Sequence, residues 1–355
     1  MKRPVVLGAG PAGSVAAYLL ARGGADPVLI DRDAKVGDAI CGGFLSWKTA
    51  ATLRDLGCDP ETLGAHRIRR LRLFAANVEA EADLPEPGFG LSRHALDTAL
   101  RDVAVSAGAD LRIERARGVA PHRIVTEKGE WHPNALFLAT GKHDVRGEAR
   151  PRHSRDPALG LRIRAPHTPG LAALIGDAIE LHLFEGGYAG VVLQEDGSAN
   201  ICLALRKSAM AEAGGRPHDL LRTYADRAPA FAARLGNLSG DEAIDTIGSV
   251  PYGWIVKATE NGVYRLGDQA AVIPSLAGEG MSIALASAKD AVAAYFNGTG
   301  ATDYQTAFAR RALRPVRTAE ALWRVSETRR GGPALAAITA RLPALARLAM
   351  RMSRI

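Results

Sequence analysis

The chain has few cysteines, few aromatic residues and no long apolar run. Its three cysteines, Cys41, Cys58 and Cys202, are an odd number at unrelated spacings, so we expect reduced thiols in a cytoplasmic protein. None of the nine histidines stands at ligand spacing from cysteines or carboxylates, so we expect no metal site. No apolar stretch is long and charge-free enough to span a bilayer. The first predicted strand begins almost at Met1, so we expect no signal peptide.

Acidic residues are scarce at the end of the chain. The net charge is +7, yet residues 303–355 hold eleven arginines against three acidic residues and so carry +8. Few aromatic residues lie among these arginines, so we expect no nucleic-acid partner. Apolar residues recur there at three- to four-residue spacing: Leu335, Ile338, Leu342, Leu345 and Leu348. Two interpretations stay open, a helix docked on the parent domain and a helix lying at a membrane surface.

The first 31 residues hold the strongest pattern in the chain. Residues 4–7 form a short apolar run typical of a buried parallel strand, and residues 8–13 satisfy the dinucleotide-binding glycine pattern. Residues 14–22 read as a helix, and residues 27–30 as a second strand that ends at Asp31. This order of strand, glycine turn, helix, strand and acidic residue predicts a Rossmann-like nucleotide-binding unit.

Each glycine of the turn has a separate physical task. Gly8 allows the tight turn, Gly10 lets the backbone approach a pyrophosphate, and Gly13 lets helix and strand pack closely. The helix N-terminus offers unpaired N–H groups to the phosphates. Asp31, about 20 residues further on, is placed to bind the hydroxyl groups of a ribose.

The rest of the chain predicts an α/β fold with an interleaved second sheet. We expect capped helices that start after Ser46 and after Ser92, strands at 67–74 and 78–84, and a turn at 85–88. Residues 110–132 resemble a strand and a small meander, and residues 135–141 a buried strand at a sheet edge. One helix at 218–235 and five strand-like stretches predict a mostly antiparallel substrate domain; the stretches are 159–165, 178–184, 187–194, 198–205 and 243–250. Residues 303–355 read as helices broken at Pro315, at 331–333 and at Pro343.

These elements give three predicted regions. The nucleotide-binding domain comprises residues 1–66, 92–150 and 257–300. The substrate domain comprises residues 67–91 and 151–256, and a helical C-terminal region comprises residues 301–355.

Three distant segments carry a family resemblance. They are the fingerprint at 8–31, Gly267-Asp268 after a strand, and the loop at 274–281 with Gly278-Glu279-Gly280-Met281 before a helix. Together they resemble the FAD-dependent oxidoreductases that share the p-hydroxybenzoate hydroxylase fold. Cys41-Gly42-Gly43 followed by a helix, with Gly-Glu-Gly-Met, is most similar to the geranylgeranyl reductase branch.

The resemblance implies roles for individual residues. Arg93 would contact the phosphate or ribityl side of FAD, and Asp268 the ribityl chain. The N–H groups of Gly280 and Met281 would face flavin N1 and O2, where reduced flavin is negatively charged. Cys41 would line the site beside flavin and substrate. The full set of expected cofactor contacts is Gly8, Gly10, Ala12, Gly13, Asp31, Arg32, Cys41, Gly42, Arg93, Gly141, Asp268, Gly278, Gly280 and Met281.

The resemblance also implies the reaction class. The expected function is hydride transfer from flavin N5 to a carbon–carbon double bond of an apolar or aromatic small molecule. Two alternatives stay open: an aromatic monooxygenase that hydroxylates through a C4a-hydroperoxide, and a flavoprotein that modifies a partner polypeptide. The electron donor is NAD(P)H or another reductant, and the oligomeric state is left undetermined. The expected location is the cytoplasm, with peripheral contact to the inner face of the membrane as the sharper alternative.

Overall fold

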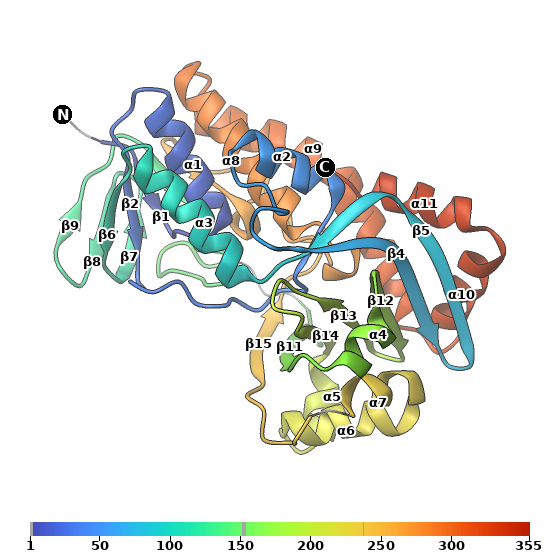
Figure 1. Cartoon of the computed structure of the whole chain (residues 1–355). Coiled ribbons are helices and arrows are strands. Elements are labelled where there is room, and N and C mark those ends of the chain that lie inside the picture. Colours follow the sequence, from blue (N-terminus) through green and yellow to red (C-terminus); the bar gives the residue numbers. More distant parts are fainter. Residues whose placement is uncertain (1–2, 151–153, 237) are drawn as a thin grey trace.

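A computed structural model describes residues 3–150, 154–236 and 238–355. Two large sheets and a helical C-terminal region account for most of the described chain (Figure 1). This arrangement confirms the predicted fold class of a Rossmann-like sheet, a second, mostly antiparallel sheet and a helical end.

The first sheet is a five-stranded parallel sheet in the order β16-β10-β1-β2-β6. Its strands are β1 (Val5–Leu7), β2 (Val28–Asp31), β6 (Asp110–Ile113), β10 (Leu136–Leu138) and β16 (Val263–Arg265). The sequence placed β10 at a sheet edge, and that prediction is wrong, since β10 lies between β1 and β16. The later strand β16 pairs with its outer side, which keeps β10 fully buried.

Helices cover one face of this sheet and a meander covers the other. α1 (Pro11–Arg22) packs against α3 (Arg93–Ser106) and α8 (Gly280–Phe296), and these helices share one core with the sheet. The predicted caps of α2 (Trp47–Asp55) and α3 are present, because Ser46 and Ser92 accept hydrogen bonds from the first turns. On the opposite face lies the meander of β7 (Ala116–Ala120), β8 (Arg123–Thr126) and β9 (Glu130–Trp131).

The second sheet has eight strands in the order β15-β11-β14-β13-β12-β4-β5-β3. Its strands are β3 (Phe44–Leu45), β4 (His66–Ala75), β5 (Val78–Gly90), β11 (Ala158–Ala165), β12 (Ala178–Phe184), β13 (Gly187–Leu193), β14 (Ala199–Arg206) and β15 (Asp245–Val250). All neighbours are antiparallel except β12 and β4, which run parallel.

The predicted turn at 85–88 is wrong, because β5 continues through it to Gly90. Pairing with β4 shifts there: Arg70 lies opposite Asp83, but Ile68 lies opposite Gly88. Residues 84–87 therefore bulge out of the ladder. At these positions the ladder requires no backbone N–H, which Pro85 and Pro87 lack.

One face of the second sheet is covered by short helices. They are α4 (Pro169–Ile175), α5 (Lys207–Glu212), α6 (Pro217–Arg227) and α7 (Pro229–Leu235). The single helix predicted at 218–235 is wrong, since it breaks at Ala228, whose ψ of 88° is far from helical. Pro229 causes this break, because proline excludes the residue before it from the helical region.

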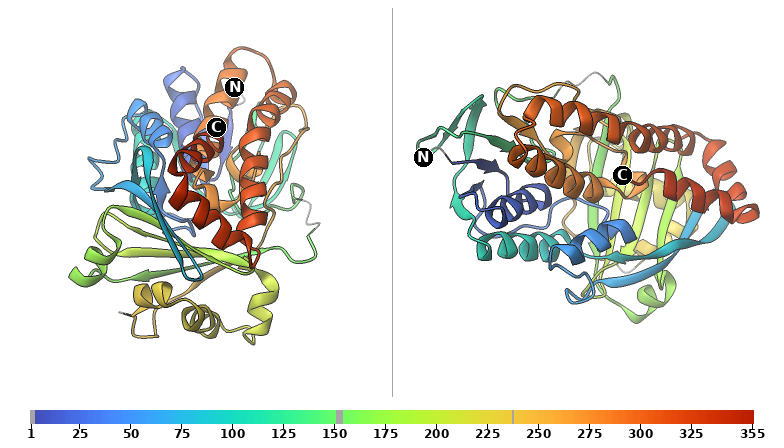
Figure 2. Two further views of the ribbon diagram at one scale, coloured as in Figure 1. Left: turned by 90° about the vertical axis from the view of Figure 1, so that its right-hand side faces the viewer. Right: turned by 90° about the horizontal axis from the view of Figure 1, so that it is seen from above.

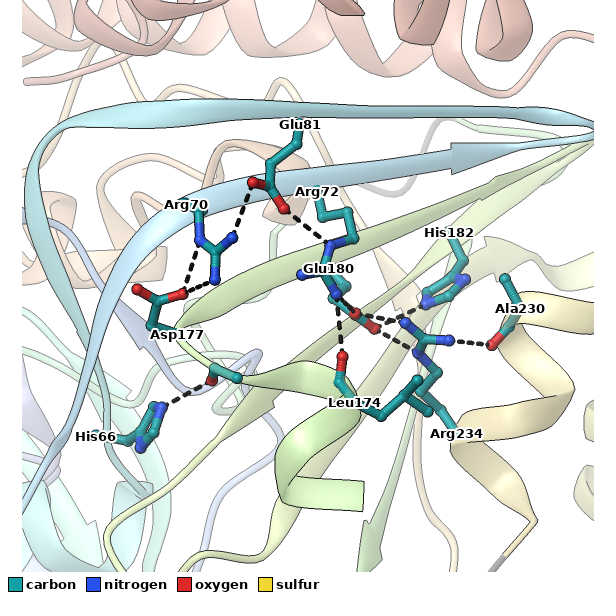
Figure 3. Close-up of polar contacts among 11 residues, drawn as sticks. His66, Arg70, Arg72, Glu81, Leu174, Asp177, Glu180, His182, Ala230 and Arg234 are labelled. Carbon is teal, nitrogen blue, oxygen red and sulfur yellow. Dashed lines mark hydrogen bonds and ion pairs between the residues drawn. The ribbon is translucent and has the colours of Figure 1, made fainter. Parts of the chain in front are cut away.

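A buried ion cluster ties α7 to this face of the sheet (Figure 3). Glu180 of β12 is fully buried, and both its oxygens lie 2.7 Å from the guanidinium nitrogens of Arg234. Arg72 of β4 donates to the same carboxylate at 2.8 Å, and His182 lies 3.3 Å from it. Glu180 and His182 alternate along β12 with Ile179, Leu181 and Leu183, whose side chains therefore point to the opposite face of the sheet.

The last three helices pack against strands of both sheets (Figure 2). They are α9 (Ala301–Ser326), α10 (Gly331–Arg341) and α11 (Pro343–Met352). α9 contacts β16 and β13, while α10 and α11 contact β5. The predicted break at Pro315 is wrong: α9 runs through it, since the loss of one backbone bond is offset by a face on which Pro315 and Val316 are buried. None of the helices in the described residues is long and apolar enough to cross a membrane.

We propose the domain division that the sequence predicts. β4, β5 and β11–β15 form one sheet, which matches residues 67–91 and 151–256. β3 crosses the division, because it belongs to residues 1–66 but pairs with β5. Two parts of this division fall on residues outside the described ones. The boundary at 150/151 adjoins residues 151–153, and the proposed nucleotide-binding domain begins with residues 1–2.

Candidate functional site

A cleft of about 1140 Å³ runs between the two sheets. At one end it is lined by the glycine turn after β1, and in its middle by the loop before α8. At the other end it is lined by leucines of the second sheet and by side chains of α10 and α11. The segments that the sequence singled out around 8–31, 41–43 and 267–281 therefore meet at one cavity.

The glycine turn is closed too tightly for side chains. Gly8 has φ +101°, and a Cβ on it would lie 2.5 Å from the carbonyl oxygen of Ala139. A Cβ on Gly13 would lie 1.8 Å from the carbonyl oxygen of Gly8. Gly10 differs, because a Cβ there meets only an Arg93 nitrogen at 3.6 Å, an ordinary contact. Gly8 and Gly13 thus shape the turn, and Gly10 presents bare backbone to the cleft.

The start of α1 suits an anionic group. Gly10 occupies the N-cap position in extended conformation, and its helix start has no capping side chain. The first-turn N–H groups therefore have no partner within the helix, and the helix dipole adds positive potential there. Ala12 lines the cleft at this point, whereas Gly13 lies behind the turn and is absent from the lining.

Asp31 supports the turn from the end of β2. Its carboxylate accepts the Ala9 N–H at 2.6 Å and the Asp33 N–H at 2.9 Å. Arg101 of α3 lies 3.5 Å from the same carboxylate and is nearly buried. The sequence did not single out Arg101, whose helical position gave no signal. Arg32 lines the cleft from an exposed position and pairs with Asp33 at 2.9 Å.

Arg93 is held at the cleft by a neighbouring carboxylate. Asp97, one turn later in α3, pairs with it at 2.6 Å, and Asp38 accepts its backbone N–H at 3.1 Å. Burial alone would lower the pKa of Arg93, but the charge and hydrogen bond of Asp97, together with the smaller effects of Cys41 and Asp268, outweigh burial and raise the pKa above its ordinary value. The guanidinium is therefore a fixed positive charge facing the turn.

Asp268 has a partner that the sequence analysis did not assign to the site. Lys142 lies 3.3 Å from its carboxylate, and both side chains line the cleft. The charge of Asp268 raises the pKa of Lys142. Gly141, with φ +60°, turns the chain just before Lys142, and Gln269 donates to its carbonyl oxygen at 2.9 Å. The loop after β10 and the turn after β16 are thereby joined.

The loop before α8 places bare backbone beside the cleft. Gly278 has φ +66°, and a Cβ on it would lie 2.8 Å from the ring of Phe44. Gly280 starts α8 with nothing within 4 Å of an added Cβ, and Met281 is buried beside it. The helix start at Gly280 has no capping side chain, so its N–H groups are free of partners within the helix.

Cys41 is half-buried at the cleft wall. Its carbonyl oxygen accepts a hydrogen bond from Asn200 of β14 at 3.0 Å, which ties this loop to the second sheet. Gly42 lines the cleft beside it, with open space where a Cβ would stand. Cys202 lies across the same wall, and burial raises the pKa of its thiol to about 12.

A hydroxyl cluster lines the wall near the loop before α8, and no sequence pattern pointed to it. Tyr188 of β13 donates to the Ser275 hydroxyl at 2.8 Å, and the Tyr252 hydroxyl lies 2.5 Å from the same oxygen. Burial raises the pKa of both tyrosines, so they are neutral hydrogen-bonding groups.

The far half of the cleft is apolar. Alternate side chains of three adjacent strands line it: Leu71, Leu73, Leu84, Ile179, Leu181 and Leu183. Side chains of the last two helices continue this wall: Leu335, Ile338, Leu345, Ala346, Ala349 and Met350.

The residues fit an FAD. Two uncapped helix starts face the same cavity, one at the glycine turn and one at Gly280, and Arg93 adds a fixed positive charge between them. A Cβ at Gly10 or Gly280 would stand in the cavity rather than in the protein. Within the described residues, no group of three His, Cys, Asp or Glu side chains is placed to hold a metal ion.

Comparison with known proteins agrees with this geometry. Residues 3–148 match the model of an FAD binding domain. A menaquinone reductase of Mycolicibacterium smegmatis is 28% identical over 86% of this chain and 78% of its own length. Digeranylgeranylglycerophospholipid reductase 2 of Methanopyrus kandleri is 28% identical over 79% of this chain and 73% of its own length.

The fold also matches solved structures. PqsL of Pseudomonas aeruginosa, solved in complex with 2-aminobenzoylacetate, superposes with a TM-score of 0.72 at 17% identity, over 94% of this chain and 99% of its own. The matched domain, the reductase relatives and the cleft together show an FAD-dependent oxidoreductase, similar in sequence to menaquinone and digeranylgeranylglycerophospholipid reductases and in fold to PqsL.

Proposed function

We propose that this enzyme reduces carbon–carbon double bonds in an isoprenoid-type lipid held between its two sheets. The observation that carries the proposal is the leucine-lined half of the cleft, which continues directly from the glycine loops. An apolar chain in that half would be removed from water along its length, and each buried CH₂ contributes about 0.8 kcal/mol. One relative is named for a geranylgeranylated phospholipid, which is a substrate of this chemical class.

The proposed FAD contacts follow the cleft. The diphosphate would be held at Gly8, Gly10 and Ala12, with Asp31 and Arg32 on the adenosine side. Gly13, which lies behind the turn, would serve by letting α1 pack closely against it. In the middle, Arg93, Gly141 and Asp268 would hold the ribityl chain. Cys41, Gly42, Gly278, Gly280 and Met281 would surround the ring. When bound, FAD supplies two-electron redox chemistry, and the protein orients it and excludes water.

The chain's own side chains give the substrate end of the site its selectivity. The hydroxyl groups of Tyr188, Ser275 and Tyr252 bond to one another, so they are satisfied without a polar substrate. An apolar substrate can therefore pass this wall without leaving a buried donor unpaired. Cys41 is a site-lining residue in this proposal.

The electron donor is proposed to be NAD(P)H or another reductant that docks transiently. Among the described residues, the five-stranded parallel sheet with its single glycine turn before α1 is the nucleotide-binding unit, and its cleft is assigned to FAD. A donor must then approach an exposed part of that cleft.

An aromatic monooxygenase is the second candidate. It is favoured by the fold shared with PqsL, whose structure holds the aromatic 2-aminobenzoylacetate. Oxygen dependence separates the two candidates, because a reductase needs no oxygen and a monooxygenase adds an oxygen atom to its product.

The test is anaerobic turnover followed by mass spectrometry. Protein reconstituted with FAD and chemically reduced is incubated with a geranylgeranylated lipid or with a phenolic compound, without and with oxygen. The proposal predicts that the lipid gains two hydrogen atoms per reduced bond without oxygen. A product that forms only in oxygen and gains an oxygen atom would show the monooxygenase instead.

We further propose that the enzyme is cytoplasmic and that α10 and α11 bring it to the inner face of the membrane. Four side chains of these helices are about half exposed, and we call them the apolar rim: Ile338, Leu342, Leu345 and Leu348 at 45%, 53%, 49% and 53%. Exposed arginines flank the rim at positions 341, 347 and 351, and residues 328–355 contain no acidic residue. Ile338 and Leu345 also line the cleft, so the rim adjoins its apolar half.

Basic and apolar groups on one helical face favour an anionic lipid surface. The test is co-sedimentation with vesicles of anionic or of neutral lipid. Leu345→Glu should weaken binding to anionic vesicles, whereas Leu313→Glu, at a leucine of α9 that is also half exposed, should not. Equal binding of the two variants would contradict the proposal.

A further inference from the structure

The end of the chain returns to the loop that precedes α8. Arg354, the penultimate residue, forms a buried ion pair with Glu279. The same guanidinium donates to the Ala277 carbonyl oxygen at 2.8 Å and lies 4.5 Å over the ring of Trp47. In Figure 1 the C-terminus accordingly lies beside α2, the helix that Trp47 begins. One arginine therefore contacts both the loop before α8 and the start of α2.

Glu279 stands at a demanding position for a carboxylate. It is fully buried between two glycines of the loop, immediately before the first residue of α8. Burial raises its pKa, whereas Arg354 and the hydroxyl groups of Ser282 and Ser46 oppose that shift. An isolated charge in such a site is strongly disfavoured, so the carboxylate depends on Arg354 as its counter-charge.

The pair is placed for more than stability. Glu279 precedes Gly280 and Met281, the residues whose N–H groups are proposed to face the flavin ring, and both Glu279 and Arg354 line the cleft. A charge at this helix start would interact strongly with a flavin ring placed there, because the two would be close together with little water between them. Neutral as a pair, Glu279 and Arg354 leave the partial positive charge of the α8 start unmasked.

We propose that Arg354 is a positioning residue for the flavin: it fixes the loop at 277–280 and cancels the charge of Glu279 next to the ring. The proposal rests on the proposed placement of FAD in this cleft. Because reduced flavin carries more negative charge than oxidised flavin, an uncancelled positive charge would favour reduction, and an uncancelled negative charge would oppose it.

The experiment measures the midpoint reduction potential of bound FAD in single and double variants. Glu279→Gln leaves Arg354 charged, since arginine stays protonated in proteins, and the potential should shift to a more positive value. Adding Arg354→Met to that variant removes the extra charge, and the potential should return toward that of the wild type. Arg314→Met, at an exposed arginine of α9, is the matched control and should leave the potential unchanged.

A pair with a purely structural role would give a different result. Its loss would lower the thermal unfolding temperature of the apoprotein in Glu279→Gln and in the double variant, but the reduction potential would show no shift that Arg354→Met reverses. An unchanged potential in Glu279→Gln, or a shift that Arg354→Met does not reverse, would overturn the proposal.

A conservative variant covers the case in which Glu279→Gln fails to fold. Arg354→Lys keeps the charge but loses the flat guanidinium that lies over Trp47 and bonds to Ala277. It should keep the wild-type potential and bind FAD several-fold more weakly, and a wild-type affinity would overturn the positioning role. If the wild type itself binds no FAD, the proposed function fails, whereas a failed charge reversal in FAD-loaded protein refutes the role of Arg354 alone.

Discussion

Replacing Gly10 by alanine separates cofactor binding from folding. Gly10 has φ −76° and ψ −173°, a conformation open to any residue, so alanine adds no backbone strain. Its methyl group would meet only an Arg93 nitrogen at 3.6 Å and would otherwise project into the cleft. The apoprotein should therefore unfold at the wild-type temperature or slightly above it, because alanine restricts the unfolded chain.

The same variant should bind FAD with lower affinity. A methyl group placed where the diphosphate is proposed to lie acts like an overpacked core position, which costs about 1–3 kcal/mol. That cost corresponds to a Kd raised about 5- to 150-fold. The measurement is titration of apoprotein with FAD, followed by flavin fluorescence, beside thermal unfolding of the apoprotein.

Two other glycines frame this result. Gly13→Ala places its Cβ 1.8 Å from the Gly8 carbonyl oxygen, so α1 must move, and both FAD binding and apoprotein stability should fall. Gly248→Ala, at an exposed glycine of β15 with open space around it, should change neither property. Wild-type FAD affinity in Gly10→Ala would refute the reasoning, because it would show that no ligand group approaches this backbone.

Three further predictions concern other parts of the molecule. Arg234→Met leaves the carboxylate of Glu180 with one fewer buried counter-charge (Figure 3), so the free energy of unfolding measured with denaturant should fall by about 3–5 kcal/mol. A fall of less than about 1 kcal/mol would contradict this prediction. A maleimide should label Cys41 faster than Cys202, since burial raises the pKa of the Cys202 thiol to about 12, and FAD should protect Cys41. Equal labelling of Cys41 with and without FAD would place FAD elsewhere. Burial lowers the pKa of His182 in the folded state, so the unfolded chain binds the proton more readily and the free energy of unfolding should fall as pH drops below about 6.5. His182→Phe should reduce this dependence of the free energy of unfolding on pH. An unchanged dependence would show that His182 does not cause it.

Local patterns predicted the parts of this fold that local physics decides. The unit of strand, glycine turn, helix and strand at 4–31 could be recognised because Gly8 and Gly13 stand where a side chain would collide with backbone, and Gly10 leaves bare backbone facing the cleft. The capped starts of α2 and α3 followed from Ser46 and Ser92. In the second sheet, alternating side chains gave the strands β11–β15 to within about two residues.

The errors arose where tertiary context outweighed local preference. Pro85 and Pro87 suggested a turn, but the pairing of β4 with β5 accommodates them in a bulge. Pro315 suggested a break, but its helix is held by a buried face. No local signal could place β10 inside the sheet, since its neighbour β16 arrives more than a hundred residues later.

The site followed the same division. The glycines and Asp268 were found because motifs report backbone geometry and position. Lys142 and Arg354 were missed, because their partners Asp268 and Glu279 become neighbours only through the folded chain. Long-range ion pairs of this kind leave no spacing pattern in the sequence.

FAD is proposed to lie along the cleft, with its diphosphate at the glycine turn and its ring at the start of α8. A crystal structure of the protein reconstituted with FAD tests this placement. Electron density is expected for the diphosphate against the backbone of Gly10 and Ala12, and for the ring against the N–H groups of Gly280 and Met281. FAD bound outside this cleft, or with its ring at the glycine turn, would rule the placement out.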